Sequence, residues 1–186
     1  MGEPPNTGRL VQSTLAVGKP GRLQALVQER RGDLAQYYLD PNTLIWNRDS
    51  SVSGQSKQSG CLIQSKYGET STTSGNFEAV VCEGSYLVHY SRNSARGSSW
   101  QRGPVISTKC LGPASLIQAQ PIGNPINNPG NFEVAVLEEK QGGGSQLVLY
   151  TRDNTKTNPQ WSPNGTVISP QATGPGALIQ TASSEQ

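Results

Sequence analysis

Seven side chains of types that bind sugars recur at matching positions in two or three similar segments of the chain. The seven are Trp46, Trp100, Trp161, Tyr90, Arg92, Tyr150 and Arg152. A flat aromatic face packs against the C–H groups of a sugar ring, and a few directed polar groups bind its hydroxyls. We therefore take these residues as candidate ligand-binding residues. In the competing interpretation each tryptophan fills a gap between neighbouring elements and each arginine bonds a loop carbonyl.

Residues that could catalyse a reaction are few. The one histidine, His89, matches Leu149 of the third segment, which favours a packing role. Glu78 and Glu133 also match each other, and although paired carboxylates can hydrolyse glycosides, their recurrence at a repeat position favours structural hydrogen bonds. The sequence holds no catalytic, phosphate-binding or metal-binding motif. We expect no enzymatic activity, and therefore no catalytic residue, metal or cofactor.

The three cysteines are Cys61, Cys82 and Cys110, and their spacing fits no metal site. As small residues they are suited to buried strand positions. One disulfide with one free thiol is the alternative.

The tryptophans belong to an internal repeat with a spacing of about 55 residues. Its copies open with "GNFEAVV" at Gly75 and "GNFEVAV" at Gly130, and a degraded copy, "GRLQALV", opens at Gly21. A second phrase, in which L-[IV]-Q begins within four residues after a glycine, occurs four times, after Gly8, Gly60, Gly112 and Gly174. A β-rich repeat of this length, punctuated by glycine, is typical of propeller blades.

The second copy indicates which strands each repeat contains. Apolar and β-branched residues predict strands at 76–81, 86–92, 104–107 and 114–119, with a hairpin turn at 83–85. Four short antiparallel strands make one blade, and stacked blades cover each other's apolar faces. The sequence thus predicts an all-β fold of β-propeller blades: three four-stranded antiparallel blades plus an extra N-terminal strand. A solenoid is the main structural alternative.

Three blades are too few for a closed ring, because propellers usually have four to eight. We expect a partial propeller or a ring completed by oligomerisation, unless the chain is a fragment of a longer propeller. An open arc leaves unpaired edges and an apolar face, which favours association. We therefore predict a homo-oligomer, in which two arcs would supply six blades.

The repeat pattern and the composition predict the domain bounds, the kinds of partner and the location of the chain. We assign 8–182 to one repeat domain, with copies at about 21–66, 75–119 and 130–181, between flexible termini at 1–7 and 183–186. The formal net charge of +2 and the lack of a Lys/Arg run argue against nucleic acid as a partner. No segment has the length and apolarity of a membrane span, and the N-terminus has no signal-peptide pattern. We expect no membrane insertion and a cytoplasmic location, unless the chain is a piece of a secreted protein.

These phrases resemble the repeat of bacterial and fungal lectin-type β-propellers, the group that includes fucose-binding lectins. The resemblance is carried by "GNFE-x-x-V", "L-V-x-Y-x-R", the tryptophan and "L-I-Q", and it covers about residues 8 to 182. In that group sugars bind between adjacent blades through aromatic side chains, arginine and backbone groups. The resemblance implies a lectin-like function with glycans, including fucosylated ones, as partners. The first copy departs from the pattern, because "YYLD" at 37–40 replaces the Tyr-x-Arg phrase.

The alternative function is a protein-interaction scaffold, or a fragment of a larger propeller that binds no sugar. Free sugar would compete for the binding site of a lectin and would leave a scaffold's interactions unchanged. Because a propeller fold serves many functions, the fold alone does not choose between the two.

Overall fold

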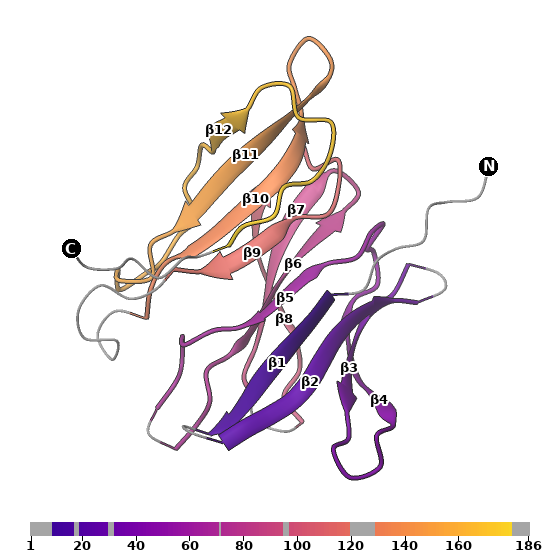
Figure 1. Ribbon diagram of the computed structural model, residues 1–186. Coiled ribbons are helices and arrows are strands. Elements are labelled where there is room, and N and C mark those ends of the chain that lie inside the picture. Colours follow the sequence, from indigo (N-terminus) through magenta and orange to yellow (C-terminus); the bar gives the residue numbers. More distant parts are fainter. Residues whose placement is uncertain are drawn as a thin grey trace.

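The computed structural model describes residues 9–16, 19–29, 32–70, 72–94, 97–119 and 129–179, and within these ranges the chain forms twelve strands and no helix (Figure 1). This confirms the predicted all-β class. The expected terminal segments at 1–7 and 183–186 lie outside the described residues.

The strands form three four-stranded antiparallel sheets that follow one another along the sequence. The first sheet contains β1 (Arg9–Ala16), β2 (Lys19–Gln28), β3 (Leu34–Leu39) and β4 (Trp46–Ser53). The second contains β5 (Cys61–Gln64), β6 (Phe77–Glu83), β7 (Tyr86–Arg92) and β8 (Gln101–Ser107). The third contains β9 (Ser115–Gln118), β10 (Phe132–Glu139), β11 (Ser145–Arg152) and β12 (Thr166–Ser169). In each sheet the strands lie side by side in chain order.

The prediction of an extra N-terminal strand is wrong. The L-[IV]-Q phrase after Gly8 is β1, which pairs with β2 and completes the first sheet. Likewise β9 pairs with β10 of the third sheet, so each of the first three phrases opens the sheet that follows it. A repeat fixes the period of a structure but not the strand at which a sheet begins. The expected boundary was therefore displaced by one strand.

The second sheet lies between the other two, with β1 against β5 and β5 against β9 (Figure 1). We call the face of a sheet that points toward the preceding sheet its head face, and the opposite face its tail face. In the first sheet, the head face is the one whose residues match the head-face residues of the second sheet. Successive side chains of a strand alternate between the two faces. In β6, Phe77 and Val81 pack with Leu26 of the first sheet, whereas Val80 packs with Val134 of the third. Each fully buried side chain of this kind stabilises the fold by about 1.5–3 kcal/mol.

A carboxylate at the end of β6 ties the second sheet to the first. The Oγ of Ser53 donates to Oε1 of Glu83 at 2.5 Å, and the Tyr90 hydroxyl and the Arg102 guanidinium donate to the same carboxylate. Burial raises the pKa of Glu83, but these hydrogen bonds outweigh it and leave the pKa below its ordinary value. The charged carboxylate therefore holds the two sheets together.

The third sheet repeats this arrangement with Glu138 at its head face. Ser107, at the end of β8, donates to Oε1 of Glu138, and the Tyr150 hydroxyl donates to the same oxygen at 2.7 Å. Burial, together with the bond to Glu138, raises the pKa of Tyr150 to about 12. A serine at the tail of one sheet and a glutamate at the head of the next thus form a recurring link between sheets.

Two of the three cysteines form a disulfide. Cys82 at the tail face of β6 is joined to Cys110, which follows β8, and their Cα atoms are 6.3 Å apart. Cys61 is buried and takes no part in the disulfide. The alternative of one disulfide with one thiol therefore describes the structure, and the cysteines do more than fill space.

Candidate functional site

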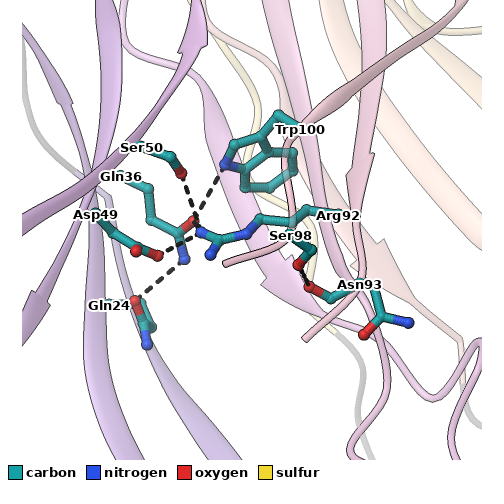
Figure 2. Close-up of polar contacts among 8 residues, drawn as sticks. All are labelled: Gln24, Gln36, Asp49, Ser50, Arg92, Asn93, Ser98 and Trp100. Atoms are coloured by element: carbon teal, nitrogen blue, oxygen red, sulfur yellow. Dashed lines mark hydrogen bonds and ion pairs between the residues drawn. The ribbon is translucent and has the colours of Figure 1, made fainter. Parts of the chain in front are cut away.

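Arg92 is the centre of a polar cluster between the first and second sheets (Figure 2). It is the last residue of β7, and its side chain is 4% exposed. Nη1 donates to Oε1 of Gln36 at 2.6 Å and to Oγ of Ser50 at 3.0 Å, and it forms an ion pair with Asp49. These partners lie on β3 and β4. They meet the arginine because the head face of the second sheet packs on the tail face of the first.

Two arginines at this junction keep a buried donor without a protein partner. The Nε atoms of Arg92 and of Arg22, on β2, are buried and bond no atom among the described residues. Buried donors are normally paired, and leaving one unpaired costs about 1–3 kcal/mol. A ligand oxygen that accepts from either atom would remove that cost.

Two clefts adjoin at the cluster. One, of 310 Å³, is lined by Arg92 and Asp49 and extends to Arg22 and Tyr38. The other, of 320 Å³, is lined by the same arginine and aspartate and reaches Trp100. Small-molecule sites begin at about 300 Å³, so each cleft has room for a small ligand.

Aromatic rings line both clefts. The guanidinium of Arg22 lies over the Tyr38 ring, 4.7 Å from its centroid, and Phe77 lines the same cleft. At the other cleft, Nε1 of Trp100 donates to Oε1 of Gln36 at 3.1 Å, the oxygen that also accepts from the central arginine. The junction therefore combines apolar ring faces with directed polar groups.

The seven predicted residues do not form one site. The structure brings Arg92 and Trp100 together through Gln36, but Tyr90 belongs to the inter-sheet link, where it bonds Glu83. In the third sheet Tyr150 likewise belongs to the link at Glu138. These two tyrosines hold sheets together in the structure.

Arg152, which matches Arg92, has different surroundings. Its guanidinium lies 5.3 Å from the Tyr67 ring centroid and 5.4 Å from that of Phe132. Trp161 is buried with its ring 5.6 Å from that of His89, and its Nε1 has no partner among the described residues. This junction is mainly an aromatic core.

Trp46, the tryptophan of the first copy, is 42% exposed. It begins β4 and belongs to the head face of the first sheet, against which the described residues place no other sheet. Leu39 stands where the other sheets have the arginine, as the pairing of β3 with β4 shows. The three matching tryptophans thus occupy three different environments.

Sequence reasoning missed three residues that build the cluster: Gln36, Asp49 and Arg22. All belong to the degraded first copy, which lacks the Tyr-x-Arg phrase and for that reason is not predicted to bind a sugar itself. Its tail face instead supplies the partners of the arginine of the second copy. One signal was present, since "RDSSVS" at 48–53 aligns with "RGPVIS" at 102–107 and puts an aspartate where Gly103 stands.

His89 and Glu78 form a buried pair, with Nε2 of the histidine 2.9 Å from Oε2 of the glutamate. Both side chains are more than nine-tenths buried, and the Ser65 hydroxyl also donates to the glutamate. The ring of the histidine packs edge-on against Phe132. The pair is a structural hydrogen bond within the second junction.

No protein family, curated protein or solved structure matches the chain. Within the described ranges, no group of three His, Cys, Asp or Glu side chains is placed to hold a metal ion. The same part of the chain holds no helix long and apolar enough to cross a membrane.

Proposed function

We propose that the protein is a non-enzymatic, lectin-like module of β-propeller type that binds a saccharide in the clefts around Arg92. The buried Nε of Arg92, which has no partner among the described residues, carries the proposal. A protein that buries an arginine for packing alone gains nothing by leaving one donor unpaired. Because Arg92 lines both clefts, a sugar hydroxyl there would accept from this atom after a small movement of the guanidinium.

The arrangement of sheets supports the propeller type. Three sheets of four antiparallel strands succeed one another in chain order, and their first strands are neighbours. In a propeller these first strands would surround the central channel. A ligand between the first and second sheets would then lie between adjacent blades, as the resemblance to lectin propellers implies.

The chemistry of the clefts suits a neutral sugar. Asp49 accepts hydrogen bonds and Arg22 and Arg92 donate them, so vicinal hydroxyls would find both kinds of partner. Tyr38 and Phe77 offer apolar faces to the C–H side of the ring. Terminal fucose, which carries three free hydroxyls and a methyl group, is the first candidate.

A glycan array with free-sugar competition tests the proposal. We expect binding to a defined terminal sugar that free sugar displaces. Arg92→Lys keeps the charge but removes Nε and the planar fork, so it should weaken the binding at least about tenfold. Arg152→Lys, at the same repeat position of the third sheet, is the matched control and should leave binding unchanged.

Because Arg92→Lys also alters a buried ion pair, a variant at the rim of the cleft is needed. Tyr38→Ala removes a half-buried ring and should weaken sugar binding while the thermal unfolding midpoint stays close to that of the parent. Folded protein that binds no glycan, or binding that survives both variants, would overturn the proposal. Capture of a protein partner that free sugar does not displace would favour the scaffold function.

A further inference from the structure

The head face of the first sheet is apolar and uncovered. Leu10, Leu23 and Val27 are 68%, 39% and 38% exposed. They match Leu62, Phe77 and Val81 of the second sheet, all of which are buried against the first sheet. The first sheet thus presents the same kind of surface that its successor buries.

The tail face of the third sheet is the complementary end of the stack and is partly exposed. Ile168 on β12 is 50% exposed, whereas the matching Val52 and Ile106 are buried in the two junctions. The three matching residue pairs read Val-Ser at 52–53, Ile-Ser at 106–107 and Ile-Ser at 168–169. The chain therefore ends in two faces that would fit each other.

Each of these two ends carries one of the two residues of the serine–glutamate link. Glu29 matches Glu83 and Glu138, and it already accepts from the Tyr37 hydroxyl at 2.6 Å and from the Arg48 guanidinium at 2.8 Å. No sheet of this chain precedes it within the described residues to supply the serine. Ser169 matches Ser53 and Ser107, and in the described part of the chain no sheet follows it to supply the glutamate.

Residues 174–179 occupy the place of a following sheet's first strand. The amide of Leu178 donates to Oγ of Ser115 at 3.0 Å, just as the amide of Leu116 donates to Sγ of Cys61 at 3.3 Å. A Cβ at Gly176 would lie 2.7 Å from the side chain of Leu147, so the backbone is in close contact with that tail-face residue. This segment partly covers the tail face of the third sheet.

We propose that the head face of the first sheet docks on the tail face of the third sheet in a second copy of this chain. The docking repeats the geometry of the two junctions within the chain, so Ser169 of one copy donates to Glu29 of the partner subunit. Two copies joined at both ends give six sheets, a number within the range of closed propellers. The interface is heterologous, because two different faces meet in it.

The segment at 174–179 and the first strand of the incoming copy occupy the same position, so one must leave. β1 is held by six paired positions along β2, whereas within the described residues the segment is held on the third sheet by one hydrogen bond and a glycine contact. The segment at 174–179 is the more weakly attached of the two, so it is the one that leaves. The segment is therefore a cap on the tail face that the partner displaces.

Two opposite-face variants test the docking by sedimentation. Val27→Arg on the head face and Ile168→Arg on the tail face each place a charge in both interfaces of the two-copy ring. The parent chain should sediment as a dimer and each variant as a monomer. Tyr86→Arg, at a 49% exposed hairpin position outside both faces, is the matched control and should remain a dimer.

Mixing the two variants distinguishes head-to-tail docking from any other dimer. The tail face of Val27→Arg and the head face of Ile168→Arg are both unaltered, so the mixture should form heterodimers with one intact interface. A parent chain that stays monomeric, or longer open oligomers in place of dimers, would overturn the proposal. A mixture that stays monomeric would also overturn it, because docking between identical faces gives no rescue.

Truncation before Gly174 tests the cap. Removal of the segment should lower the dimer dissociation constant at least about tenfold, since the partner no longer displaces it. An unchanged or raised dissociation constant would show that the segment does not compete with the partner. This inference is independent of the sugar site, because none of the variants alters a residue of the Arg92 clefts.

Discussion

Arg92 and Arg152 hold the same position of the repeat, one at each junction between sheets, yet their surroundings differ. Arg92 meets Asp49 and Gln36, while Arg152 lies over the rings of Tyr67 and Phe132. The residue that matches Asp49 in the second sheet is Gly103, so the second junction offers no carboxylate at that place. One substitution in the preceding sheet thus decides whether the arginine bonds a charge or an aromatic face.

A second position strengthens the contrast. Gln36, His89 and Leu149 match one another on the third strands of the three sheets. Gln36 accepts from both Arg92 and Trp100, whereas His89 bonds Glu78, and Nε1 of Trp161 has no partner in the described ranges. The first junction is therefore a polar cleft and the second a packed core. Repetition conserves the scaffold, and the residue at this position sets what the junction can bind.

The largest expected effect concerns the second junction, where the disulfide lies. The bond between Cys82 and Cys110 closes a loop of 28 residues, and its loss should lower the free energy of unfolding by about 3–4 kcal/mol. Urea unfolding with and without dithiothreitol measures this. In a Cys82→Ser, Cys110→Ser chain the reductant should have no further effect, and Cys61→Ala should leave the response of the parent intact. A parent chain whose stability ignores the reductant would contradict the covalent link.

Gln36→Leu places in the first sheet the residue type that the third sheet has at the matching position, Leu149. The change leaves Nη1 of Arg92 with fewer acceptors and Nε1 of Trp100 with none, which should cost about 2–4 kcal/mol of stability. Urea unfolding provides the value. Leu149→Gln, at the matching half-buried position, is the control and should change stability by no more than about 0.5 kcal/mol. Equal effects in the two sheets would remove the distinction between polar and packed junctions.

The smallest expected effect is a loss of stability at alkaline pH, and it concerns the second junction. The unfolded chain loses the Tyr150 proton near the ordinary pKa of 10.0, whereas the folded chain keeps it until about 12. The stabilisation is therefore complete below pH 10 and is lost as the pH rises toward 12. Thermal midpoints between pH 9 and 12 should fall in the parent chain and fall less steeply in Tyr150→Phe. Parallel curves would show that the phenol does not contribute.

The sequence predicted the strands of the second copy because their apolar residues alternate and the copies confirm one another. It misplaced the sheet boundary because the phrase at 114–119 follows the second copy in the chain but pairs with the third. Pairing is a long-range choice, and strand patterns alone do not make it. Seven candidate residues were identified by recurrence, and recurrence marks what every junction shares.

For that reason the sequence predicted only part of the polar cluster. Arg92 and Trp100 recur, but Gln36 and Asp49 are singular, and a search for repetition passes over them. Their importance appears only when the tail face of one sheet meets the head face of the next. The differences between copies, read position by position, would have been the better guide to a ligand site.

The pairing of strands in chain order also governs how the protein is made. Each sheet is built from one contiguous stretch of the chain, so the strands that pair with each other are neighbours in the sequence. A chain leaving the ribosome can therefore close one sheet before the next is synthesised. Each new sheet buries the apolar tail that its predecessor exposes, so the growing end is the part of the nascent chain most in need of protection from aggregation.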